Sequence, residues 1–154
     1  MEIADPGMFL EAANIINRTE IEMGRLANER GQSESIRKLG ERMVQDHTLL
    51  EDKLKVLAKV KDIVLSKHLD IKHQKMIDNL AAYSGVAFDR HYVDDQVKAH
   101  QKAIALYQQV AAENRDRSVR DLAANSLPVL QQNLQLAEKD SKMMIEPPGA
   151  SAGQ

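Results

Sequence analysis

The sequence predicts an all-α protein, a four-helix bundle, and three observations lead to that prediction. Ala, Leu, Lys, Glu, Gln and Met are plentiful, whereas aromatic residues make up only 3% of the 154 residues; this composition favours helix over sheet. Apolar residues recur at alternating steps of three and four along four long stretches, which is the period of one helix face. Tight turns join these stretches in pairs, so we expect two antiparallel helical hairpins.

The first hairpin has clear start and stop signals. Asp5 is a favoured N-cap, Pro6 suits the first helical position, and Gly31 is a typical helix end. Ser33 or Ser35 is expected to cap the second helix. The apolar stripe of the first helix contains Phe9, Ala12, Ile16, Met23 and Leu26, and that of the second contains Ile36, Leu39, Met43, Leu50, Leu54 and Leu57.

A crossover and a second hairpin follow. The crossover is predicted at 61–87, with a short helix from Ser66 to Ala82. Long helices are expected from about Phe88 to Glu113 and from about Arg117 to Met143. Pro128 lies inside the last helix and should kink it modestly, because proline removes a backbone donor.

The chain is predicted to form one domain, the four-helix bundle of residues 1–143, followed by a disordered tail at 144–154. The two halves also repeat each other at an offset of 83 residues without a gap. Ser35 to Gly40 then lies over Ser118 to Ala123, and Phe9 lies over Tyr92. Agreement in length, turn position and apolar phase supports the prediction of paired hairpins.

Charge and residue content exclude several classes of function. The 21 basic and 23 acidic residues are interspersed and give a formal net charge of -2, so we expect no nucleic-acid partner. The absence of Cys excludes disulfides and thiol chemistry. The longest apolar runs are too short for a transmembrane segment, and no signal peptide is predicted at the N-terminus. No nucleophilic triad or phosphate-binding loop is present.

Polar residues interrupt the predicted inner faces at a common level. Glu20, His47, His100 and Asn133 each lie on the inner side of one long helix, and Asp46 flanks the stripe of the second. At 1.5 Å per residue, all of them lie roughly 20 Å from their turns, so they should converge near mid-bundle. A buried unpaired polar group costs about 1–3 kcal/mol or more. We therefore expect these groups to bind one another, water or an ion.

Two interpretations of this cluster remain open. In the first, the cluster binds a single iron or zinc ion, with Asn133 and Asp89 supporting the ligands. The expected ligands are Glu20, Asp46, His47 and His100. In the second, the cluster is a hydrogen-bonded polar core in which a carboxylate orients the imidazoles. A di-iron centre is not expected, because Val44 and Val97 stand where a Glu-x-x-His motif needs Glu.

Several segments together resemble the bacterial ferritin-like family catalogued as domain of unknown function 4142, over about residues 6 to 140. They are Phe9-Leu10-Glu11-Ala12-Ala13, Glu20 to Ala27, Met43-Val44-Gln45-Asp46-His47, Phe88-Asp89-Arg90-His91-Tyr92, Val97 to His100 and Leu127-Pro128. The resemblance implies a ferritin-like bundle in the periplasm or cell envelope, and no established reaction. Asn133 stands where family members often have a His after Leu-Pro, which removes one ligand from a complete site.

Three classes of function follow from these expectations. The first is an exported bundle protein with a structural, interaction or stress-protective role and no established catalysis, whose protein partner or second copy would bind an exposed helix face. The alternative is a protein that holds one iron or zinc ion at mid-bundle. The third is an iron oxidase, for which the ligand set is incomplete. No catalytic residues are assigned.

Overall fold

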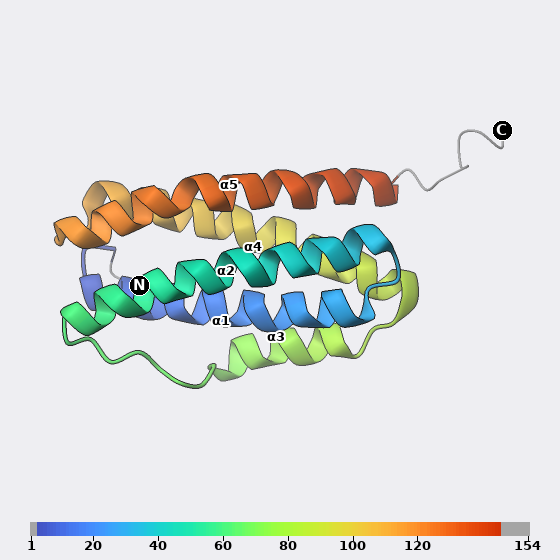
Figure 1. The fold of residues 1–154 in the computed structure, drawn as a ribbon, viewed down its shortest axis with the longest axis horizontal. Helices are drawn as coiled ribbons and strands as arrows, with labels where there is room; N and C mark the ends of the chain where they lie inside the picture. The colour runs from blue at the N-terminus through green and yellow to red at the C-terminus, as the bar shows by residue number, and fades with distance from the viewer. Residues whose placement is uncertain (1–2, 146–154) are drawn as a thin grey trace.

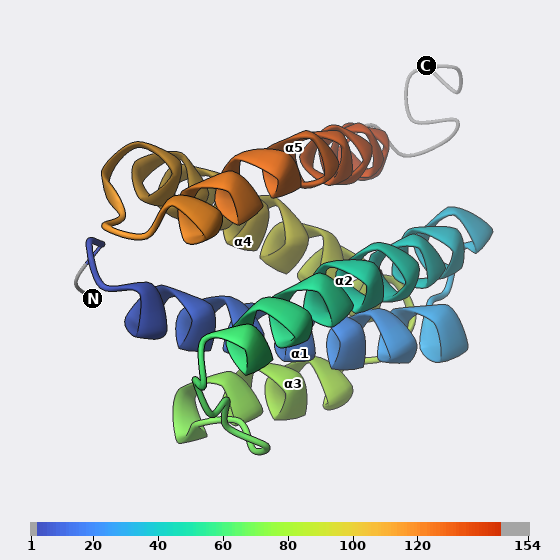
Figure 2. The same ribbon diagram turned by 60° about the vertical axis from the view of Figure 1, so that its left-hand side comes forward.

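The computed structural model describes residues 3–145, in which every regular secondary-structure element is a helix. The five helices are α1 (Pro6–Arg30), α2 (Glu34–Val60), α3 (Ile71–Ala81), α4 (Gly85–Glu113) and α5 (Arg117–Ile145). The hairpins α1–α2 and α4–α5 lie side by side along the long axis (Figure 1). The short helix α3 packs outside α1, on the side away from α5 (Figure 2). This confirms the all-α class and is consistent with a ferritin-like bundle.

The ends of the long helices follow the local signals. The Asp5 Oδ1 atom accepts a hydrogen bond from the Met8 N–H at 3.0 Å, and Pro6 is the first residue of α1. The Ser33 hydroxyl caps α2 by accepting from the Ile36 N–H at 3.2 Å. The last helix extends to Ile145, so the first two residues of the predicted tail are helical; residues 146–154 lie outside the described part of the chain.

The crossover helix starts later than the sequence predicts. Residues 66–70 are not helical, because long-range contacts hold them: the Ser66 N–H donates to Glu11 Oε2 at 2.9 Å. The helix begins only after Asp70, whose carboxylate accepts from the His73 N–H at 3.0 Å. At its other end, Ser84-Gly85 both ends the crossover and begins α4, and Gly85 adopts a positive φ of 61°.

Helices α1 and α2 approach each other backbone to backbone. A Cβ atom on Gly40 would lie 2.6 Å from the Gly24 carbonyl oxygen and 2.7 Å from the Ala27 Cβ. A Cβ on Gly24 would in turn lie 2.9 Å from the Gly40 carbonyl oxygen. Only glycine permits this contact, so the two helices lie close together beside the buried side chains of Met23 and Leu39.

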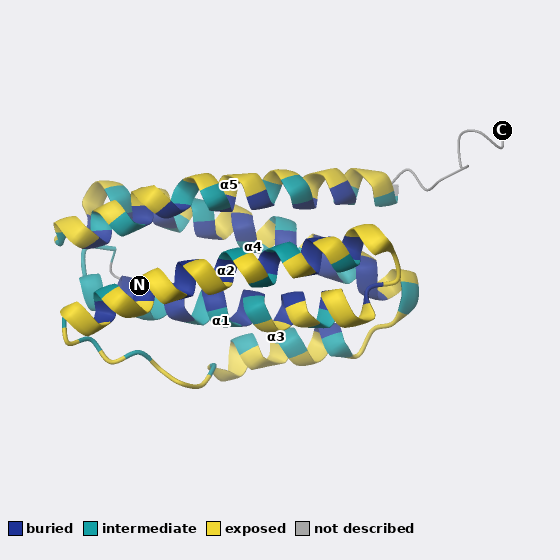
Figure 3. Ribbon diagram, in the orientation of Figure 1, coloured by how far each residue is buried: buried dark blue, intermediate teal, exposed yellow. Residues whose placement is uncertain are grey.

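Buried residues recur along the inner sides of the long helices (Figure 3). Their apolar members form two clusters, and buried polar residues lie between them. The cluster at the end that contains the α4–α5 turn includes Phe9, Leu10, Leu50, Leu54, Tyr107, Val110, Val119 and Leu130. The cluster at the opposite end includes Met23, Ile36, Leu39, Met43, Phe88, Tyr92, Val93 and Ala137. Between them lie Asn17, Glu20, His47, Glu51, Gln96, His100 and Asn133, all buried. The bundle therefore has a polar layer at mid-height.

None of the helices within residues 3–145 combines the length and apolar character that a bilayer span requires. This agrees with the expectation from the sequence that the chain has no transmembrane segment.

Candidate metal centre

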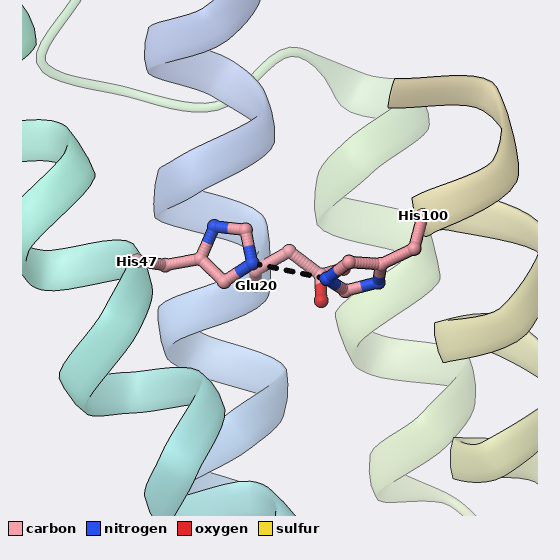
Figure 4. A group of neighbouring side chains, drawn as sticks. All are labelled: Glu20, His47 and His100. Carbon is pink, nitrogen blue, oxygen red and sulfur yellow. Dashed lines mark hydrogen bonds between the residues drawn. The ribbon is translucent and has the colours of Figure 1, made fainter. Parts of the chain in front are cut away.

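Three side chains of the polar layer converge from three helices. Glu20 comes from α1, His47 from α2 and His100 from α4, and the side chains point toward one another (Figure 4). Each offers one donor atom, and the three donor atoms all lie within 4.8 Å of one another. The residues are at most 2% exposed. Within residues 3–145, no other set of three or more His, Asp or Glu side chains comes this close.

The two imidazoles face each other through their Nε2 atoms, which lie 3.3 Å apart. Their Nδ1 atoms point away toward acceptors. His100 Nδ1 lies 2.9 Å from the Gln96 carbonyl oxygen, which can only accept, so this nitrogen carries the proton. His47 Nδ1 lies 2.9 Å from Asn17 Oδ1. We assign a proton to this nitrogen too, because the Asn17 amide points its NH₂ group at Glu51 Oε1, 3.3 Å away.

Both Nε2 atoms therefore present lone pairs to the same point. Two lone pairs at this separation repel each other unless a proton or a metal ion lies between them. A proton is disfavoured at neutral pH, because burial, together with the neighbouring His100, lowers the pKa of His47 to about 3. Burial also lowers the pKa of His100. The pair is thus arranged as two neutral imidazole ligands, each with its other nitrogen held by an acceptor, as is usual at metal sites.

Glu20 supplies a carboxylate that lacks a hydrogen bond. Its Oε2 atom is buried without a partner. Burial raises the pKa of Glu20 to about 8; the adjacent Gln96 side chain opposes this rise without reaching hydrogen-bond geometry, and Asp95 adds to it. A buried carboxyl group left in this state is costly. A bound cation would provide the missing partner and favour the ionised form.

The spacing of the imidazoles matches one coordination geometry. Zinc–nitrogen bonds of about 2.0–2.1 Å place two tetrahedral ligands about 3.3–3.4 Å apart, whereas two adjacent ligands at a right angle would lie about 2.9 Å apart. The observed Nε2 separation is 3.3 Å. The two Nε2 atoms therefore have the separation that tetrahedral coordination needs. The Glu20 donor atom, within 4.8 Å of both, would complete three protein ligands by moving toward them.

Asp46, a ligand expected from the sequence, does not join this group. It is only half-buried, and its carboxylate accepts a hydrogen bond from Arg42 Nε at 2.7 Å. One residue corresponds to a rotation of about 100° on a helix. With His47 directed into the bundle, Asp46 is directed along the flank, where Arg42, one turn earlier, binds it.

Asp89 and Asn133, the two residues expected to support the ligands, have different surroundings. Asp89 lies roughly 16 Å before His100 along α4 at 1.5 Å per residue. Its carboxylate accepts from the Gln32 N–H at 2.8 Å and the Ser33 N–H at 3.0 Å, so it stabilises the α1–α2 turn and not the metal ligands. Asn133 is fully buried, and neither atom of its amide has a hydrogen-bond partner.

Asn17 and Glu51 belong to the polar layer although the sequence did not single them out. Two signals could have identified them. The offset of 83 residues between the halves places Asn17 in register with His100, and Glu51 lies one helical turn after His47. The resulting chain of contacts runs from Glu51 through Asn17 to His47, so these two residues orient one of the imidazoles.

Comparison with known families assigns the chain. The family model described as Domain of unknown function (DUF4142) matches residues 3–139. The chain belongs to this family. No curated protein matches the sequence. Membership confirms the resemblance noted in the motifs, and the family description supplies no reaction.

Two solved structures share the fold. A DUF305 fragment from Deinococcus radiodurans superposes with a TM-score of 0.75 at 13% identity, covering 87% of this chain and 93% of that one. CopM in the Cu(II)-bound form superposes with a TM-score of 0.72 at 16% identity, covering 90% of this chain and 96% of that one. At these identities the likeness shows the fold alone.

Proposed function

We propose that this protein binds a single transition-metal ion between Glu20, His47 and His100. The observation that carries the proposal is the pair of facing Nε2 atoms, 3.3 Å apart, each with its lone pair fixed by the acceptor at the other ring nitrogen. The unpartnered Glu20 Oε2 atom supplies a third donor nearby, which a bound cation would hold in its ionised form. Polar side chains buried only to stabilise a bundle would be expected to satisfy one another.

The donor set favours zinc first and mononuclear iron second. Two histidines and one carboxylate are the protein ligands of many zinc sites that keep a fourth position open, and of non-haem iron(II) sites. The tetrahedral spacing of the Nε2 atoms supports zinc. Cu(II) prefers tetragonal ligands, but the shared fold of Cu(II)-bound CopM makes copper a necessary third ion in any test.

A structural or stress-protective role in the envelope is the competing proposal. It rests on the family resemblance, and no contact among residues 3–145 supports it directly. The periplasmic or envelope location, and a protein partner on an exposed helix face, remain predictions on the same basis. Within the part of the chain that the structure describes, the donor geometry favours metal binding over these alternatives.

Metal titration of the purified protein, prepared without a nickel column and stripped with chelator, tests the proposal. We expect one equivalent of zinc or anaerobic iron(II) to remain bound after desalting, measured by elemental analysis. The His47→Gln and Glu20→Gln variants should lose it, whereas Asp46→Asn and His73→Gln, which change groups outside the cluster, should retain it. Retention of less than about a tenth of an equivalent of zinc, iron and copper would overturn the proposal.

A further inference from the structure

A groove on the surface of the bundle leads to the cluster. It has a volume of about 330 Å³ and opens between α1, α3 and α4. Of the three cluster residues, Glu20 alone lies on its wall, together with Thr19 of α1, Met76 of α3 and Ala99 of α4. A second groove, of about 400 Å³, lies between α1, α2 and the crossover, and none of the cluster residues lines it.

We propose that the groove between α1, α3 and α4 is the route by which the ion reaches the site, and that it takes the ion as a complex with a small carboxylate chelator. This inference rests on the proposed metal site. The three ligands are at most 2% exposed, so an ion in solution cannot contact the histidines directly. Glu20 both lines the groove and belongs to the cluster, so it is the ligand that meets the ion first.

The chemical class of the incoming ligand follows from the charges on the groove. Three lysines, Lys72, Lys98 and Lys102, line it and are exposed, whereas its carboxyl groups are Asp95 and Glu20. His73 also lines the groove and is bound to Asp70. Because ammonium groups outnumber carboxyl groups at the opening, a hydrated divalent cation is repelled there and an anionic complex is attracted. The volume corresponds to about eleven water molecules, which is enough for a citrate-sized chelator.

The crossover helix forms the movable wall. Lys72, His73 and Met76 of α3 line the groove, and Leu80 is the one residue of α3 that is fully buried. A helix held by so few buried contacts opens at a lower free-energy cost than the four long helices. This gives the helix in the crossover a role beyond connecting the hairpins, because its displacement would widen the path to Glu20.

The route is tested by obstructing it with tryptophan. In Met76→Trp the indole would fill the groove, while Gln74→Trp places the same residue on the other groove from the same helix. Zinc uptake by the metal-free protein is followed by stopped flow with a chromophoric competitor. We expect Met76→Trp to slow both uptake and release about tenfold or more with the Kd unchanged, and Gln74→Trp to match the parent. Ala99→Trp, from the opposite wall, is the second variant if Met76→Trp does not fold.

The chelate is tested by reversing charge. Zinc is supplied either as the aqua ion or as the citrate complex to the parent, to Lys98→Glu/Lys102→Glu and to the control Lys53→Glu/Lys59→Glu on the exposed side of α2. We expect the groove variant to take up zinc from citrate about tenfold more slowly and aqua zinc faster, with the control unchanged. Equal rates in Met76→Trp and Gln74→Trp would overturn the route, and an unchanged preference between the two zinc sources would overturn the chelate. A parent that binds no zinc from either source would instead remove the metal site itself.

Discussion

His47 and His100 face each other through Nε2 atoms 3.3 Å apart, in the buried middle of the bundle, and we assign the ring protons to the Nδ1 atoms. The Nδ1 atom of each ring contacts an acceptor, which is Asn17 Oδ1 for His47 and the Gln96 carbonyl oxygen for His100. The arrangement is unfavourable for two neutral imidazoles alone and favourable for two ligands of one cation.

Removing one imidazole should affect the stability of the metal-free protein and its stabilisation by zinc in different ways. His100→Leu takes away one of the two facing lone pairs, and its Nδ1 contact is to a backbone carbonyl, so no side-chain donor loses its acceptor. We expect the metal-free variant to melt at the same temperature as the parent or higher. The rise in Tm on adding zinc should disappear, because that rise requires binding to the folded state. A metal-dependent Tm shift equal to that of the parent would remove His100 from the site.

The Asn17 amide should control metal affinity without contacting the metal. Asn17→Leu removes the acceptor that fixes the protonated nitrogen of His47. We expect zinc to bind about 10–100-fold more weakly, as is typical when a ligand loses its supporting hydrogen bond. Competition with a chelator of known affinity measures the change. The matched control is Asn14→Leu, which removes a buried amide that contacts Glu11, Ser66 and Arg18 and not the cluster. Equal losses in the two variants would contradict the role of Asn17.

The metal-free protein should be most stable at mildly acidic pH. The pKa of Glu20 rises from 4.5 to about 8 on folding, so the folded state holds this proton more tightly and stability falls as pH rises from 4.5 to 8. The pKa of His47 falls from 6.5 to about 3, so the unfolded state binds this proton more tightly and stability falls as pH drops from 6.5 to 3. Urea unfolding across pH 3–9 should show a maximum between about 4.5 and 6.5.

Two variants test which residue causes the decline in stability on each side of the maximum. Glu20→Gln should flatten the decline above the maximum, and His47→Leu should reduce the decline below it. Other acids, such as the buried Glu51 and the half-buried Asp95, also have raised pKa values. The comparison is therefore the difference in stability between parent and variant at each pH. A Glu20→Gln profile parallel to that of the parent between pH 4.5 and 8 would show that Glu20 does not titrate as proposed.

The contact between α1 and α2 should not accept a methyl group. In Gly40→Ala the new Cβ would lie 2.6 Å from the Gly24 carbonyl oxygen, so the helices must separate. We expect a loss of about 1–3 kcal/mol in the free energy of unfolding, the usual cost of overpacking. Gly7→Ala is the control, because its Cβ meets nothing closer than 3.4 Å and alanine favours the helix by about 0.5–1 kcal/mol. Stabilisation of both variants would contradict the close contact.

Much of the fold follows from local signals in the sequence. Asp5-Pro6, Gly31 and Ser33 mark helix ends through contacts with residues a few positions away, so their effect can be read without the structure. The start of α3 could not be predicted from local signals, because Ser66 binds Glu11, which lies in a distant part of the chain. The close contact at Gly24 and Gly40 likewise depends on how two helices meet.

The candidate site was accessible to prediction only in part. Counting residues from the turns puts Glu20, His47 and His100 at one level, and the structure brings these three together. The same counting included Asp46, because distance from a turn does not determine which of two adjacent residues is directed inward. In the structure Arg42 binds the Asp46 carboxylate on the flank of the helix. The directions of the ring nitrogens depend on hydrogen bonds to Asn17 and to the Gln96 carbonyl group. Residue spacing along the sequence does not reveal these hydrogen bonds.

X-ray absorption at the zinc edge, on protein loaded with one equivalent of zinc, tests the central claim most directly. The account predicts a four-coordinate site with two imidazole nitrogens and a carboxylate oxygen at about 2.0–2.1 Å, and one remaining light-atom ligand. It also predicts the loss of one imidazole contribution in His100→Leu. A spectrum without imidazole scattering, or one that is unchanged in His100→Leu, would show that the facing histidines do not bind the ion.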